Sequence, residues 1–255
     1  MKHRRTPGQH PQGGPPFGPA TSGEAAIAVH LLFELLDLLL PTTCAGCRTG
    51  RTQLCPACRT ALAATRPGPA GPQPAPPGLP PLHAAGPYAD PVRRLLIAHK
   101  ERGALRLAGP LGRALARAVH PLLDGRPVLL VPMPSTRRSV RARGHDPTLR
   151  LARAAARELR RGGHPVRAAP VLRHGRAVAD QSGLTAAQRR TNLHGALVPG
   201  PGAARLLTGR QPVLVDDLVT TGATLVEAAR ALGALGHPPR GAATVAAAVR
   251  RRQPG

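Results

Sequence analysis

The sequence predicts an α/β protein in which a parallel sheet is flanked by helices and preceded by a small four-cysteine module. Two observations predict this class. In the larger part of the chain, short apolar segments of strand length alternate with amphipathic segments of helical period. Nearer the N-terminus, four cysteines fall within 15 residues, which is typical of a module held together by something other than its own core.

We expect four segments along the chain. Residues 1–23 are rich in proline and glycine and lack an apolar period, so they should form a disordered basic tail. Residues 24–65 hold a leucine-rich helix and the cysteines. Half of the residues from Arg66 to Pro81 are proline, so 66–82 is predicted to be an extended linker. Residues 83–250 then form the larger domain.

The leucine-rich helix, Ala25 to Leu40, is the nearest approach to a membrane span. Glu34 and Asp37 interrupt its apolar run, and no run of about 18 apolar residues occurs. We therefore expect a largely buried helix, no membrane insertion and a cytoplasmic protein.

Periodicity places the remaining elements in order. The apolar positions predict helices over 91–99, 107–119, 149–160 and 223–235, and strands over 127–131, 166–172, 212–215 and 243–249. Strands that are apolar throughout and separated by helices are typical of a parallel sheet covered on both faces.

Charge and aromatic content restrict the partners. The chain has 36 Lys and Arg against 12 Asp and Glu, a formal net charge of +24, which favours phosphorylated or polyanionic partners. Its aromatic residues are Phe17, Phe33 and Tyr88, with no tryptophan, so recognition of bases by stacking is disfavoured.

The cysteines form a CxxC-x7-CxxC pattern, at Cys44, Cys47, Cys55 and Cys58. Two such pairs can bring four thiolates into a tetrahedron, the geometry of structural zinc, with no position left for chemistry. An iron–sulfur cluster could use the same four ligands, and disulfides would need an oxidising compartment.

The segment VLVDDLVTTGATL, Val213 to Leu225, is the most informative for function. A buried strand delivers Asp216 and Asp217 to its carboxyl end, where open parallel sheets bind ligands. Thr220, Thr221, Gly222, Ala223 and Thr224 then turn the chain into a helix. The N–H groups and hydroxyls of such a turn suit a phosphate, whereas paired carboxylates suit a sugar diol or Mg²⁺.

This segment resembles the 5-phosphoribosyl-1-diphosphate (PRPP) motif of type I phosphoribosyltransferases throughout its length. The resemblance implies that Asp216 and Asp217 take the ribose hydroxyls and that residues 220–224 wrap the 5′-phosphate. Together with the cysteines and the segments 130–154 and 180–197, the likeness extends to the ComF family, competence protein F and its relatives. It covers about Leu31 to Val249.

The resemblance also implies a pyrophosphate loop at Pro132, Met133 and Pro134. A cluster of arginines follows, and guanidinium groups suit bidentate binding of a diphosphate. Its members are Arg137, Arg138, Arg141 and Arg143. Asp146 stands where the family more often has an amide, which departs from the pattern.

A mobile flap is implied by a pattern in 180–197 whose matching residues are Gln181, Leu184, Arg189, Arg190 and Asn192. Closing such a flap would exclude water from the reacting sugar. Lys100, the one lysine of the larger domain, is either a phosphate contact or a surface charge. None of the eleven histidines has metal-ligand spacing to a partner.

Two functions follow from the resemblance. One is an enzyme, a pentosyl-transferring glycosyltransferase that passes phosphoribosyl from Mg²⁺-PRPP to a nitrogen acceptor and releases pyrophosphate. The other is a non-catalytic accessory of DNA uptake that contacts single-stranded DNA or a competence helicase and binds PRPP or a nucleotide as a signal.

Overall fold

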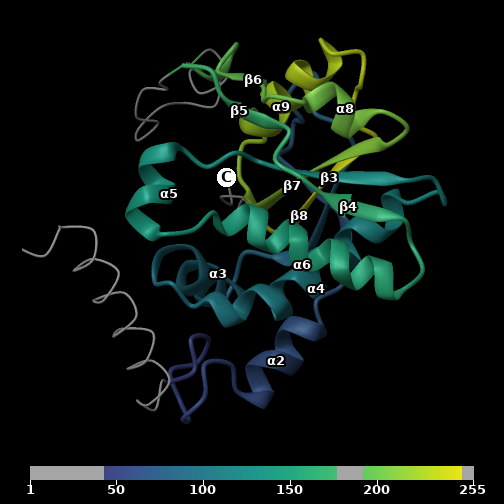
Figure 1. Cartoon of the computed structure of the whole chain (residues 1–255). Coiled ribbons are helices and arrows are strands. Elements are labelled where there is room, and N and C mark those ends of the chain that lie inside the picture. The colour runs from purple at the N-terminus through teal and green to yellow at the C-terminus, as the bar shows by residue number, and fades with distance from the viewer. Residues whose placement is uncertain (1–42, 177–191, 249–255) are drawn as a thin grey trace, which may run out of the picture. The chain divides into compact units, whose positions relative to one another are not determined.

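The computed structural model describes residues 43–176 and 192–248, which fall into one compact unit (Figure 1). The tail 1–23 and the helix predicted at 25–40 lie outside these ranges. So do Val249, at the end of the last predicted strand, and four residues of the flap pattern: Gln181, Leu184, Arg189 and Arg190. Among the described residues, no helix is both long and apolar enough to cross a bilayer.

The central sheet is mostly parallel, as the sequence predicts. Its strand order is β1-β2-β8-β7-β3-β4. These strands are β1 (Gly68–Pro69), β2 (Leu82–Pro87), β3 (Val128–Pro132), β4 (Val166–Ala168), β7 (Gln211–Val219) and β8 (Gly241–Ala247). Every neighbouring pair from β2 to β4 is parallel, and only β1 joins antiparallel.

Alternating side chains of the central strands enter separate cores on the two faces of the sheet. In β7, Val213 and Val215 join one hydrophobic cluster, and Leu214 joins the other. β3 alternates in the same way and is buried along its whole length. Burial on both faces explains why β3 and the 212–215 part of β7 are apolar at every position. The strand predicted over 212–215 continues to Val219 and includes Asp216 and Asp217.

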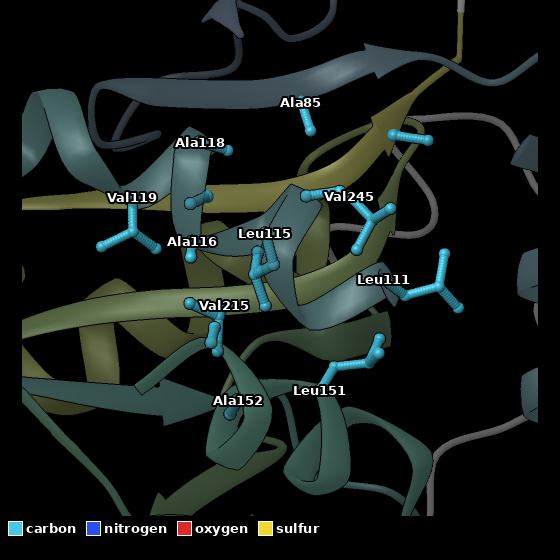
Figure 2. Packing of buried hydrophobic residues seen from close by; sticks show 14 of the residues in the cluster. Ala85, Leu111, Leu115, Ala116, Ala118, Val119, Leu151, Ala152, Val215 and Val245 are labelled. Atoms are coloured by element: carbon cyan, nitrogen blue, oxygen red, sulfur yellow. The ribbon is translucent and has the colours of Figure 1, made fainter. Parts of the chain in front are cut away.

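Helices cover both faces (Figure 1). The first face packs against α3 (Val92–Glu101), α4 (Ala108–Val119) and α6 (Pro147–Arg161), and the second against α8 (Ala203–Leu207) and α9 (Ala223–Gly233). Short 3-10 turns, Leu105–Leu107 and His120–Leu122, precede and follow α4. Figure 2 shows Leu115 of α4 at the centre of the first core, between Val215, Val245 and Ala152.

Helices α4 and α6 approach each other closely at Gly112. A methyl group added there would collide with the Ala154 side chain and lie 3.1 Å from backbone atoms of Ala154 and Ala155. The glycine therefore lets the two helices approach to a distance that a larger residue would prevent.

The segment predicted as one strand over 166–172 forms two. β4 ends at Ala168, and β5 (Leu172–His174) pairs antiparallel with β6 (Leu197–Pro199) in a separate two-stranded sheet. Pro170 lies between them, and a proline has no N–H to donate to a sheet. Within the segment predicted as an extended linker, Gly68 and Pro69 form β1 and pair with β2.

The cysteine module shares the first core. Its helix α2 (Pro56–Ala63) buries Leu62, which joins Cys44, Leu54 and Cys58 in the same cluster as Leu95 of α3. Arg117 of α4 donates to the Leu62 carbonyl oxygen at 2.9 Å. The module is thus packed against the helices of the sheet.

Candidate functional site

Asp216 and Asp217 lie beside the loop of Pro132, Met133 and Pro134, which we call the Met133 loop, at the carboxyl edge of the sheet. β7 and β3 are parallel neighbours with Val215 opposite Pro132, and the Met133 N–H donates to the Val215 carbonyl oxygen at 2.9 Å. Asp216 and Asp217 follow directly. The sheet thus brings together two segments that the sequence separates by about 80 residues.

The turn after β7 leads into α9 as the sequence predicts. Gly222 precedes the first helical residue with φ +71°, a left-handed conformation that favours glycine. The Thr221 hydroxyl accepts a hydrogen bond from the Ala223 N–H at 3.5 Å. A Cβ on Gly222 would lie 3.0 Å from Leu79, so the proline-rich segment closes over this turn.

Lys100 is directed at this site. Its Nζ donates to Asp217 Oδ2 at 2.8 Å, from the last turn of α3. The Asp217 side chain is 10% exposed and that of Lys100 38%, so the pair is partly desolvated. Burial lowers the pKa of the Lys100 ammonium, but the facing Asp217 and Asp216 carboxylates outweigh that effect and leave the pKa raised. The ion pair with Asp217 therefore fixes the positive charge of Lys100 at this site.

Asp216 has different surroundings. Its Oδ1 accepts from the Asp217 N–H at 2.8 Å. Burial, followed by repulsion from the Asp217 carboxylate, raises the pKa of Asp216 well above its usual range. A carboxylate that ionises at such a cost is stabilised by an added cation, because opposite charge favours the ionised form.

The arginine cluster lies on α5 (Arg137–Arg143), a short helix at the same edge (Figure 1). Thr136 caps its start, accepting from the Ser139 N–H, and Gly144 ends it with φ +71°. Arg143 forms a bidentate ion pair with Glu101 of α3, at 3.0 and 2.9 Å. The other three, Arg137, Arg138 and Arg141, are exposed.

Asp146, which departs from the family pattern, caps a helix. Its Oδ1 accepts from the Leu149 N–H at 3.0 Å and from the Ser135 hydroxyl at 3.3 Å. The acid thus starts α6 and fixes the loop before α5.

Two residues that the sequence did not single out also shape the site. His174 Nε2 lies 3.0 Å from the Pro134 carbonyl oxygen and ties the Met133 loop to β5. Glu101 holds Arg143. Both contacts join residues about 40 apart in the chain, and no local pattern signals them.

Asn192 is the one residue of the predicted flap pattern that lies within the part of the chain that the structure describes. Arg176 Nη2 donates to the Asn192 carbonyl oxygen at 2.8 Å and to the His194 carbonyl oxygen at 2.9 Å. These bonds join the two ends of the segment between the described ranges.

The four cysteines converge near the start of the described chain. All four thiol sulfurs lie within 4.8 Å of one another, and none is in a disulfide. Four such sulfurs could hold a metal ion. Backbone N–H groups support them, since Cys55 N donates to Cys44 Sγ and Cys58 N to Cys55 Sγ, each at 3.4 Å.

The immediate surroundings of the cysteines fit a bound ion. Burial raises the pKa of Cys44, but N–H donors from Cys55, Cys47 and Gly46 outweigh it and lower the pKa to about 6. A Cβ on Gly46 would lie 2.7 Å from Cys58 Sγ, so only glycine leaves room for that sulfur. The donor set is four thiols with no oxygen ligand, as structural zinc prefers.

A small cavity of about 130 Å³ lies between the cysteine module and α3. Four arginines line it: Arg48, Arg93, Arg94 and Arg102. Asp90 pairs with two of them, Arg93 and Arg94, at 3.0 and 2.8 Å. The remaining positive charge can attract an oxyanion.

Neither the protein-family models nor the curated proteins include a match to this chain.

Proposed function

We propose that the chain is a phosphoribosyltransferase-family protein of the ComF type that binds Mg²⁺-PRPP at the carboxyl edge of its sheet. One observation carries the proposal: Asp216 and Asp217, the turn 220–224 and the Met133 loop meet at that edge, with Lys100 2.8 Å from Asp217. Carboxylates beside an anion-binding turn suit a ligand with a diol or metal at one end and a phosphate at the other.

Each part of the edge has a role in this proposal. Asp216 and Asp217 take the ribose hydroxyls, directly or with Mg²⁺, and Thr220, Thr221, Gly222, Ala223 and Thr224 surround the 5′-phosphate. Pro132, Met133 and Pro134 receive the diphosphate, with Lys100 and the α5 arginines as its counter-charges. Gln181, Arg189, Arg190 and Asn192 belong to a flap that covers the ligand.

The reaction we propose is displacement at C1 of the ribose. The C1–O bond breaks with its electron pair going to the diphosphate, and the lone pair of a nitrogen acceptor forms the new C1–N bond. The proton of that nitrogen passes to solvent. Positioning and stabilisation of the leaving diphosphate would supply most of the rate enhancement.

Calorimetry with PRPP, with and without Mg²⁺, tests the binding. We expect Mg²⁺-dependent binding that the double variant Asp216→Asn, Asp217→Asn abolishes. Asp124→Asn is a matched control, because Asp124 pairs with Arg240, whose backbone N–H bonds to Pro212 at the amino edge of the sheet. Absence of Mg²⁺-dependent binding to the unaltered protein would refute the proposal, and pyrophosphate release with an added base would establish the enzyme.

The cysteines have a structural role in this proposal. We assign them a zinc ion, since all four ligands come from the protein and leave no open position. Free thiols are typical of the cytoplasm, and we place the protein there.

A second candidate function rests on the arginine-lined cavity beside the cysteine module. An oxyanion site there favours contact with the phosphates of single-stranded DNA, as expected of a DNA-uptake accessory that works beside a competence helicase. Such binding would be electrostatic and would fall steeply with salt. Fluorescence anisotropy with a labelled single-stranded oligonucleotide tests this binding. No binding at about 50 mM NaCl would exclude the second candidate function.

A further inference from the structure

A larger cavity, of about 520 Å³, adjoins the turn after β7. Its walls come from the proline-rich segment, from the ends of β2 and β8, and from Thr220 and Thr221. The two aspartates, Lys100 and the Met133 loop are not among the residues that line it. Its volume is that of an ordinary small-molecule site.

The cavity is apolar over much of its surface and carries one charge. Arg66 is the single charged side chain among the described residues that line it, and none of them is acidic. The Arg66 guanidinium has no hydrogen-bond or ion-pair partner within the described chain. Arg66 is exposed, and an arginine that lines a cavity without a protein partner for its five N–H donors can bind an anionic oxygen pair.

The other polar groups of the cavity can also donate. Gln73 contributes an amide, and Thr220 and Thr221 contribute hydroxyls. Thr221 accepts from the Ala223 N–H through a lone pair, so its hydroxyl hydrogen is still able to donate. Among the side chains that line the cavity, these and Arg66 are the polar ones.

The walls are held in place without a ligand. Gly68 and Pro69 pair with Ala84 and His83 of β2, and the Ala70 N–H donates to the Leu82 carbonyl oxygen at 2.9 Å. Such a preformed cavity reduces the entropy that binding must overcome.

We propose that this cavity is a second ligand site, for a small monocarboxylate with an apolar body, whose carboxylate is held by Arg66. A single guanidinium matches one carboxylate in charge and in bidentate geometry, and the prolines and alanines match an apolar body. The cavity shares Thr220 and Thr221 with the turn that we assign to the 5′-phosphate, but Arg66, which supplies its charge, lies outside the proposed PRPP site.

Ligand-observed fluorine NMR with para-fluorobenzoate tests the proposal on the full chain. We expect binding at sub-millimolar to millimolar concentration, and about tenfold weaker binding to Arg66→Gln, because a charge-assisted bond is lost. The neutral para-fluorobenzamide should bind at least tenfold more weakly than the acid. Arg157→Gln makes the same change on an exposed part of α6 and should leave binding unchanged.

Undiminished binding to the Arg66→Gln variant, or equal binding of the acid and the amide, would overturn the proposal. Calorimetry of Mg²⁺-PRPP on the same variant separates the two sites, since its affinity for PRPP should be unchanged. A parallel loss of PRPP binding would show that Arg66 serves the PRPP site, against this proposal. Fluorobenzoate binding that depends on Arg66, in a protein that fails to bind PRPP, would refute the proposed function and leave this site standing.

Discussion

At the scale of single residues, the two adjacent aspartates should have opposite effects on stability. Asp217 faces the Lys100 ammonium at 2.8 Å, whereas Asp216 lies beside the Asp217 carboxylate, and its pKa is raised by burial and by that neighbour. An acid whose pKa is raised in the fold lowers the stability of the fold wherever it is ionised.

We predict that Asp216→Asn stabilises the fold, by on the order of 1 kcal/mol at about pH 8. The gain should shrink as the pH falls through the raised pKa towards about 4, because protonation neutralises Asp216 in the unaltered protein as well. The amide oxygen introduced by the substitution can keep the bond from the Asp217 N–H. Urea denaturation at the two pH values measures this, and a loss of stability at pH 8 would contradict it.

Asp217→Asn should change the stability of the fold in the opposite direction. It removes the carboxylate that Lys100 contacts at 2.8 Å, and because Lys100 is partly exposed and Asp216 still faces it, we expect a loss of at most about 1 kcal/mol in the same denaturation experiment. Opposite signs for the two variants would show that the site retains a destabilising carboxylate, as functional sites often do.

Whether the role of a site residue could be predicted from the sequence depends on how far along the chain its partner lies. Asp216, Asp217 and the turn 220–224 form one local pattern and were predictable. The Lys100–Asp217 pair spans 117 residues, so the sequence left the role of Lys100 open between two alternatives. Glu101 and His174 act through partners that only the fold brings near.

At the scale of elements, strands buried on both faces were predictable because they are apolar throughout. β3, the 212–215 part of β7 and, apart from Thr244, β8 are of this kind. β2 was not predicted, because it follows the proline-rich segment and contains glycine and proline itself. β5 and β6 have three residues each, too few for a period to show.

The packing of α4 on α6 leads to a prediction at Gly112. Gly112→Ala should destabilise the protein by about 1–3 kcal/mol, because the new methyl group meets backbone atoms of α6 that cannot move independently. This exceeds the gain in helix propensity from alanine. Thermal denaturation measures the effect.

Gly233→Ala is the control for Gly112→Ala. Gly233 also lies in a helix, at the end of α9, and a methyl group there meets no atom within 4 Å. It should be neutral or slightly stabilising, by about 0.5 kcal/mol. Equal effects at the two positions would contradict the role of the close helix contact.

At the scale of the whole molecule, the cysteine module and the sheet share one hydrophobic core. Cys44, Leu54 and Leu62 lie in the same cluster as Leu95 and Leu111. Removing the zinc ion that we propose for the cysteines should therefore destabilise the sheet domain together with the module. A module with its own core would instead unfold separately.

We predict that a chelator lowers the melting temperature by about 10 °C or more in one cooperative transition. Differential scanning calorimetry measures this, and the chelator saturated with zinc is the control. Elemental analysis should give one zinc per chain, and iron would contradict the assignment. An unchanged melting temperature after proven metal loss would contradict the shared core.

Helix α3 contacts both the cysteine module and Asp217. Arg94 donates to the Gly46 carbonyl oxygen inside the cysteine module at 3.4 Å, and Lys100, about 9 Å further along the axis, reaches Asp217. A change in the position of the cysteine module would tilt α3 and shift the Lys100 ammonium group near its other end. If the proposed zinc and PRPP sites are both right, starvation for zinc would then weaken PRPP capture while most of the protein is still folded.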